Sequence, residues 1–123
     1  MRKIKKYQQP NIFRSFYYAL RGLGFVFYTQ KNMRIHLFMA CVALGLGIFF
    51  QISKLEWISL IFSILFVLFA ETINTALEIN VDLTTKKIKF RAMLSKDLAA
   101  GAVLISAINA IIIGCFIFGP RLF

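Results

Sequence analysis

The amino-acid sequence predicts an all-α integral membrane protein, in which three transmembrane helices follow an amphipathic helix that lies on the membrane surface. Three observations favour this fold class. Hydrophobic residues make up 59% of the 123 residues, more than a soluble domain of this length has room to bury. The apolar residues gather in three long runs, and most basic residues gather in two of the segments that flank these runs. A single membrane domain over residues 1–123 is therefore expected.

The first predicted element is an amphipathic surface helix over residues 11–30. When this stretch is read at the helical period, one face is apolar, and Arg14, Tyr18 and Arg21 share another face. The apolar face carries Phe13, Phe16, Leu20, Leu23 and Phe27. Such a helix is typical of segments that lie in the membrane interface. The pattern leaves open whether this helix only anchors the chain to anionic lipid or also has a second task.

Three apolar runs, at residues 35–50, 57–70 and 98–118, predict the transmembrane helices. A helix needs about 20 residues to cross about 30 Å of hydrocarbon. The third run is long enough by itself, and the first must draw in residues at either end. The second run can span the membrane only if it includes Glu71 and Asn74. The predicted spans therefore cover about residues 33–52, 57–80 and 96–118.

The basic residues predict the orientation of these spans. Eight of them precede the first apolar run and five lie between residues 86 and 96. The eight are Arg2, Lys3, Lys5, Lys6, Arg14, Arg21, Lys31 and Arg34, and the five are Lys86, Lys87, Lys89, Arg91 and Lys96. By the positive-inside rule, the N-terminus and the connection over residues 79–97 lie in the cytoplasm, and residues 51–56 and the C-terminus lie outside. Because the charges flank membrane segments, no nucleic-acid partner is expected.

Four polar residues of the second span, Glu71, Asn74, Glu78 and Asp82, fall on one stripe of the helix. With Trp57 at the outer interface, Glu71 lies about 21 Å into the membrane, and Glu78 lies about 31 Å in, at the inner boundary. A charged carboxylate in hydrocarbon costs at least about 3 kcal/mol, so such residues face a protein interior or a wet cleft and usually have a function. A stripe that runs from lipid to cytosol suits a lipid headgroup that reacts with a soluble substrate.

A purely structural interpretation of this stripe stays open. In it, Asn74 would bond across a helix interface, and the acids would pair with Lys96 or Arg91. Lys96 and Asp97 mark the cytoplasmic end of the third span, where both could also be ordinary flanking charges. The single histidine, His36, is interpreted as an interfacial side chain with its hydrogen bonds satisfied. No glycine-rich nucleotide loop of the GxxxxGK[ST] or GxGxxG type occurs in the sequence.

The stretch "ETINTALEINVD" at residues 71–82, followed by "KDLAAGAVL" from residue 96, resembles the prokaryotic diacylglycerol kinase family. The upstream "NMRIHL" and the "LEW" before the second span look more like its undecaprenol kinase branch. The resemblance covers about residues 13–118. It implies three spans with a surface helix, a place in the bacterial cytoplasmic membrane, and transfer of the γ-phosphate of Mg-ATP to a lipid hydroxyl. It also implies a homotrimer, and active sites shared between protomers are expected because three helices enclose little space.

The resemblance also implies roles for individual residues on the acid stripe. Glu71 matches the family's catalytic base, and Asn74 matches its polar neighbour. Glu78 matches a metal-binding carboxylate that also holds the nucleotide, and Asp82 matches a supporting acid. Gln30 stands where the family usually has a second metal-binding glutamate, and its neutral amide oxygen is a weaker ligand for Mg²⁺. Gln30 could still touch the metal and nucleotide, water could replace it, or another acid could shift to help.

Four further residues match nucleotide contacts of the family. Lys96 and Asp97 lie at the start of the third span, whereas Tyr18 and Arg14 lie on the surface helix. The cofactor expected with ATP is Mg²⁺. The two cysteines, Cys41 and Cys115, fit no metal-ligand spacing, and the sequence holds no His/Cys cluster for zinc.

The function favoured by the sequence is therefore a lipid kinase that acts on undecaprenol, with diacylglycerol as the alternative lipid. A second class of function is a membrane oligomer that conducts ions or protons, in which Glu71 would be a relay carboxylate. A third is a scaffold subunit whose acids only pair helices. A channel has no need for Lys96, Asp97 and Asp82 at its cytoplasmic end, which favours the kinase.

Overall fold

The computed structural model describes residues 11–84, 86 and 89–123. Throughout these residues the regular structure is helical, in the order α1 (Ile12–Thr29), α2 (Lys31–Phe49), α3 (Lys54–Thr84) and α4 (Phe90–Leu122). The helices α2, α3 and α4 are long and apolar enough to cross a membrane. The predicted all-α membrane fold with three long apolar helices is thus confirmed. Five basic positions used to predict the orientation, Arg2, Lys3, Lys5, Lys6 and Lys87, lie outside the described residues.

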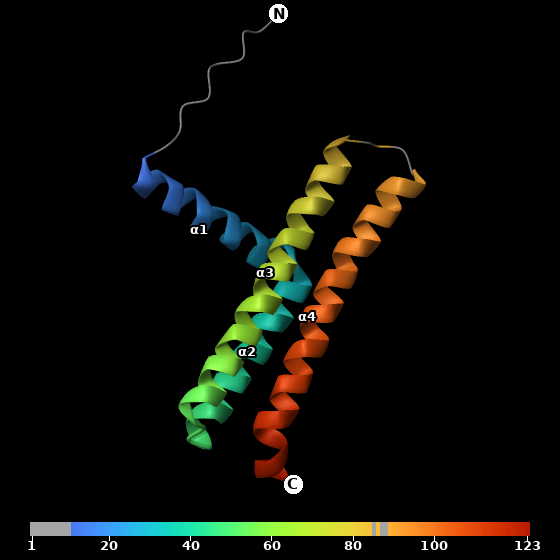
Figure 1. Cartoon of the computed structure of the whole chain (residues 1–123). Helices are drawn as coiled ribbons and strands as arrows, with labels where there is room; N and C mark the ends of the chain where they lie inside the picture. Colours follow the sequence, from blue (N-terminus) through green and yellow to red (C-terminus); the bar gives the residue numbers. More distant parts are fainter. Residues whose placement is uncertain (1–10, 85, 87–88) are drawn as a thin grey trace, which may run out of the picture.

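Helix α1 contacts α2 and α3, but its first part projects away from the three long helices (Figure 1). Its first turn is capped by Asn11, whose side chain accepts a hydrogen bond from the Arg14 backbone N–H at 2.9 Å. Val26 is its one buried residue, so nearly all of its apolar face is open to a membrane or to another chain. This arrangement fits the surface helix that the sequence predicts.

A one-residue corner at Gln30 joins α1 to α2. Gln30 has an extended backbone, with φ −108° and ψ 111°, and is the C-cap of α1 and the N-cap of α2. The Arg34 guanidinium reaches back from α2 and donates to the carbonyls of Phe27 and Tyr28 at 3.1 and 2.8 Å. Because the last carbonyls of a helix have no partner within the helix, these bonds stabilise the corner.

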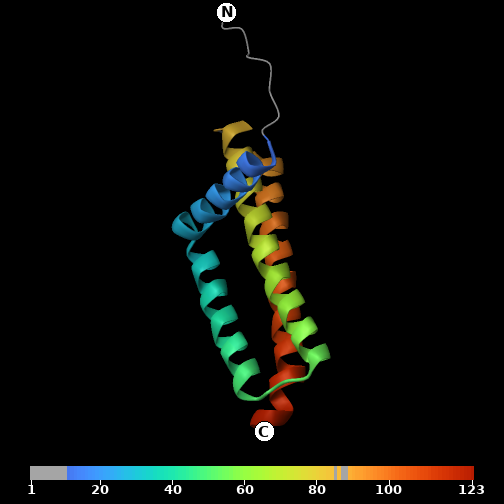
Figure 2. The ribbon, with the colours of Figure 1, turned by 90° about the vertical axis from the view of Figure 1, so that its left-hand side faces the viewer.

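The two longest helices, α3 and α4, run side by side, and α2 packs beside the part of α3 that is nearest the α2–α3 turn (Figures 1 and 2). At about 1.5 Å per residue, α2 is about 28 Å long and α3 about 46 Å. The ends of α3 and α4 therefore extend past the α1–α2 corner on the side where α3 connects to α4.

The predicted connection over residues 79–97 is much shorter in the structure. Helix α3 continues to Thr84, and α4 already begins at Phe90. No glycine or proline interrupts residues 79–97, so nothing stops either helix where the hydrophobic run stops. The apolar pattern marks where a membrane would end, whereas the helix ends farther on.

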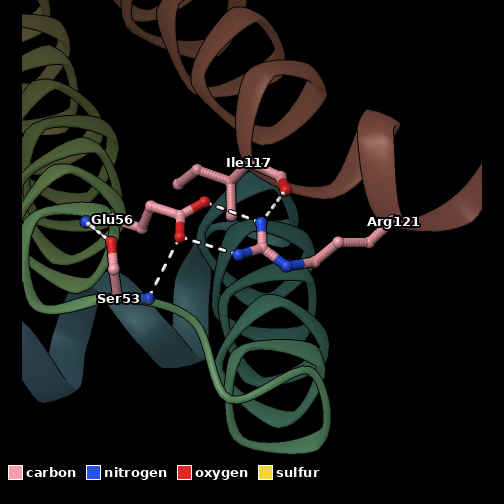
Figure 3. A network of polar contacts seen from close by, with 4 residues as sticks. All are labelled: Ser53, Glu56, Ile117 and Arg121. Atoms are coloured by element: carbon pink, nitrogen blue, oxygen red, sulfur yellow. Dashed lines mark hydrogen bonds and ion pairs between the residues drawn. The ribbon is translucent and has the colours of Figure 1, made fainter.

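A polar clamp closes the opposite end of the bundle (Figure 3). Arg121 at the end of α4 donates to both carboxylate oxygens of Glu56 at 2.7 and 2.8 Å. Glu56 also accepts from the Ser53 backbone N–H at 3.0 Å, while the Ser53 hydroxyl accepts from the Glu56 N–H at 3.3 Å. This reciprocal pair is a capping box at the start of α3.

An apolar core lies beneath this clamp and joins all three long helices. Its buried side chains are Ile52, Leu60, Ile117 and Phe118. Close packing here depends on Gly47 of α2, since a Cβ at that position would meet the Trp57 ring at 2.7 Å. The two segments predicted to face outward, the α2–α3 turn and the C-terminus, therefore meet at one end of the bundle.

Candidate active site

The polar stripe of α3 becomes progressively more exposed along the helix. Glu71 is 1% exposed and Asn74 is 7% exposed. Glu78, about two turns farther along, is half-buried, and Asp82 is exposed. This gradient follows the one expected from the sequence, from a closed interior toward the end of α3 that extends past the corner.

Asn74 links the two glutamates of the stripe. Its side-chain Nδ2 donates to Glu78 Oε1 at 3.3 Å, within the same helix. Of the structural interpretation, the described residues do not form a bond from Asn74 across a helix interface, whereas the pairing of an acid with Lys96 is formed by Asp82. The hydrogen bond instead fixes the orientation of the Glu78 carboxylate.

Two buried oxygen atoms of the stripe lack a hydrogen-bond donor among the described residues. They are Glu71 Oε2 and Asn74 Oδ1. A buried acceptor without a donor costs about 1–3 kcal/mol, and such atoms are rare in folded proteins. Residues 71 and 74 are neighbours on one helix face. The stripe is thus a closed cluster of acceptors that is short of donors, which suits a ligand that carries a hydroxyl group.

His36 of α2 is a basic side chain that approaches this cluster from a second helix. Its Nε2 lies 4.0 Å from Glu71 Oε2. The interpretation of His36 as a side chain with satisfied hydrogen bonds overlooked this pairing. The rise per residue could have indicated it. Measured from the α2–α3 turn, His36 lies about 20 Å along α2 and Glu71 about 26 Å along α3, so the two residues are at similar depths, within about one helical turn.

At the end of the stripe, Lys96 of α4 and Asp82 of α3 form an ion pair with an Nζ–Oδ1 distance of 2.6 Å. The Lys96 and Asp82 side chains are 41% and 65% exposed, so solvent screens the pair and it contributes little to stability. Its main effect is to hold a cation above Glu78. Asp97, the next residue of α4, is exposed.

The structure does not bring the two surface-helix residues to the stripe. Arg14 and Tyr18 lie in the first half of α1, which stands away from α3 and α4 (Figure 1). Hydrogen bonds and ion pairs of the described residues do not connect them to the stripe. Tyr18 instead lies under the Arg21 guanidinium, whose carbon is 5.0 Å from the ring centroid. This cation–π pair presents an aromatic ring and a cation on one exposed face of α1.

The carboxylate oxygens of the stripe suit a magnesium ion that arrives with a nucleotide. The described residues contain no group of three or more His, Cys, Asp or Glu side chains that could hold a metal. Mg²⁺ is commonly bound through one or two carboxylates together with substrate phosphates. Glu78 offers such a carboxylate. Gln30 lies half-buried at the α1–α2 corner, and its Nε2 is 3.4 Å from Thr29 Oγ1.

Comparison with known proteins assigns the chain to a family. The family model of prokaryotic diacylglycerol kinase matches residues 17–118. An undecaprenol kinase of Bacillus subtilis strain 168 is 40% identical over 111 residues, which cover 89% of this chain and 89% of the relative. A diacylglycerol kinase of Synechocystis sp. is 38% identical over 115 residues, which cover 92% of this chain and 66% of the relative.

A diacylglycerol kinase of Haemophilus influenzae is 37% identical over 65 residues, which cover 53% of this chain and 55% of the relative. The family match spans α2 and α3 and most of α1 and α4. The chain therefore belongs to the prokaryotic diacylglycerol kinase family, and it is a multi-pass membrane lipid kinase that catalyses ATP-dependent phosphate transfer to an alcohol group.

Proposed function

We propose that this chain phosphorylates undecaprenol, with Mg-ATP as the phosphate donor and Glu71 as the general base. The observation that carries the proposal is the fully buried Glu71 carboxylate beside Asn74, in a cluster that lacks donors. A lipid hydroxyl would supply a donor at that depth. The choice of undecaprenol is supported by the relative that bears the name undecaprenol kinase and matches 89% of both chains. Diacylglycerol is the second candidate, since two other relatives are named diacylglycerol kinases.

In the proposed reaction, the Glu71 carboxylate takes the proton of the lipid hydroxyl. The lipid oxygen forms a bond to the γ-phosphorus, and the bond between the γ-phosphorus and the bridging oxygen of ADP breaks. Phosphoryl transfer of this kind depends on positioning and charge neutralisation more than on covalent catalysis. Mg²⁺ supplies charge neutralisation when it is bound with the nucleotide, and Glu78 and Gln30 would hold it.

The nucleotide would bind at the end of the stripe that extends past the corner. Lys96 lies on α4, the helix beside Glu78 of α3, and would exchange its partner Asp82 for a phosphate oxygen. Asp97, the next residue of α4, would also contact the nucleotide. Arg14 and Tyr18 lie apart from this place within one chain. A homotrimer with sites shared between protomers would let the α1 of one protomer reach the α3 of another.

We propose a place in the bacterial cytoplasmic membrane, with the N-terminus and the α3–α4 connection in the cytoplasm. The Lys96–Asp82 end of the bundle would then meet cytosolic ATP, and the Glu56–Arg121 end would lie outside. Cysteines placed at Lys54 and Lys86 should react with an impermeant thiol reagent from opposite sides of sealed vesicles. Reaction of both from the same side would overturn the orientation.

Transfer of label from γ-labelled ATP tests the substrate. Purified protein in mixed micelles would receive undecaprenol, diacylglycerol or neither, with Glu71→Gln as the inactive control. Faster labelling of undecaprenol at equal mole fraction supports the proposal, and faster labelling of diacylglycerol overturns it. Membership of a kinase family already argues against the ion-conducting oligomer, for which ATP would have no role.

A further inference from the structure

The His36–Glu71 pair joins α2 to α3 at the most buried ionisable group of the described chain. Glu71 is 1% exposed, and the separation between His36 Nε2 and Glu71 Oε2 is 4.0 Å. The His36 side chain is 21% exposed, so it is less buried than Glu71 and is partly accessible. The two residues come from different helices, and their separation thus depends on how α2 packs against α3.

The polar neighbours of Glu71 on its own helix do not support its carboxylate. The Thr75 hydroxyl donates to the Glu71 backbone carbonyl at 3.0 Å. The Asn74 amide donates to Glu78. Glu71 Oε2 has no donor, and among the described residues His36 is the one basic side chain with a nitrogen within 4.0 Å of this carboxylate.

We propose that His36 is a positioning residue for Glu71. The Nε2–H of His36 donates to Glu71 Oε2 during the reaction, which leaves Oε1 to receive the proton of the lipid hydroxyl. This role rests on the proposed function of Glu71 as the base. A hydrogen bond requires about 2.7–3.2 Å between nitrogen and oxygen, so the pair must close by about 1 Å. Rotation about the terminal torsions of both side chains provides such a movement, since these torsions have broad minima.

The need for a positioning residue follows from the geometry of a carboxylate base. The terminal torsion of a glutamate is loosely defined, so an unsupported carboxylate presents either oxygen in many orientations. A donor from a second helix fixes one oxygen and thereby aims the other. Misplacement of a reacting group by about 1 Å can reduce the rate by about 10²-fold, which sets the scale of the expected effect.

Two substitutions of His36 and one control substitution separate positioning from packing. His36→Gln keeps an N–H donor where the imidazole has Nε2. His36→Phe keeps a ring of similar size without a donor, and Met39→Leu, an exposed change on the same helix, is the control. We expect kcat to fall by roughly 10–100-fold in His36→Phe, with the KM for Mg-ATP unchanged. His36→Gln should recover most of that loss, and Met39→Leu should match the wild type.

The outcome is decided by kcat, KM and thermal unfolding measured on the full-length protein in the same micelles. Equal kcat for His36→Phe and the wild type overturns the proposal. Equal impairment of the Gln and Phe variants also overturns it, because packing alone would then explain the loss.

A double variant separates this proposal from the assignment of the base. In the Glu71→Gln background, His36→Phe should have no further effect on the residual rate, since the two residues act as one unit. Additive losses overturn the positioning role. An active Glu71→Gln enzyme would instead overturn the proposed base, whatever the result for His36.

Discussion

Replacement of Glu71 by glutamine should nearly abolish phosphate transfer while the fold and the binding of Mg-ATP persist. The substitution keeps the size of the side chain and removes its ability to accept a proton. General-base assistance contributes about 10²–10⁴-fold to a rate, and kcat should fall by that factor. Glu71 and Glu78 are separated by seven residues, or about 10 Å along the helix axis. The affinity for Mg-ATP should therefore stay the same or rise slightly, as one negative charge is removed at that distance.

The same substitution should make the protein more stable. A charged glutamate in hydrocarbon costs at least about 3 kcal/mol, and Glu71 is 1% exposed with an oxygen that lacks a donor. A neutral amide removes the charge and brings a donor of its own. We expect an increase of about 1–3 kcal/mol in the free energy of unfolding, which corresponds to a Tm a few degrees higher.

The assay is label transfer from ATP to lipid, with nucleotide binding and thermal unfolding measured on the same preparations. Glu56→Gln is a matched control, since it makes the same chemical change at the other end of α3, where Glu56 pairs with Arg121. This control should keep the kinase rate and lose some thermal stability. A Glu71→Gln enzyme within about tenfold of the wild-type kcat would refute the general-base role. Loss of nucleotide binding together with activity would also refute it.

Three further substitutions test the metal site and the packing. Glu78→Gln should raise the Mg²⁺ concentration needed for half-maximal activity, because it removes an anionic ligand; an unchanged midpoint would contradict metal binding by Glu78. Gln30→Glu should lower that Mg²⁺ concentration, because it adds an anionic ligand. Coincident Mg²⁺ titrations of the wild type, Gln30→Glu and Gln30→Ala would show that residue 30 does not bind the metal. Gly47→Ala should destabilise the protein by about 1–3 kcal/mol through overpacking, since its Cβ would lie 2.7 Å from the Trp57 ring. Thermal unfolding measures this, and an unchanged Tm would show that α2 can shift.

The helical period predicted which residues share one face of a single helix. The polar stripe of α3 and its gradient of exposure follow from spacing and rise alone, and both agree with the structure. The end of each helix was harder to predict, because a membrane boundary does not break a helix that lacks glycine and proline. Helix α3 therefore continues to Thr84, and α4 begins as early as Phe90.

Most contacts between helices could not be predicted from the sequence. The His36–Glu71 approach, the Glu56–Arg121 pair and the Asn109–Ser63 contact at 3.4 Å each depend on the rotation of one helix about its axis relative to another. A single sequence sets which residues share a face, and it leaves that relative rotation undetermined. The sequence did offer a pairing of the acids with Lys96, since both charges flank the same connection, and Asp82 forms that pair.

The two ends of the bundle differ in how well their polar groups are paired, and the difference suits an enzyme that acts on lipid. At the Arg121 end, Glu56 accepts hydrogen bonds from Arg121 and Ser53, and an apolar core lies directly beneath. Toward the other end, Glu71 and Asn74 keep buried oxygens without donors. Unpaired polar groups destabilise a fold, so the paired end offsets what the stripe costs. The predicted gain in stability of Glu71→Gln, at the expense of activity, would be the direct sign that this cost serves catalysis.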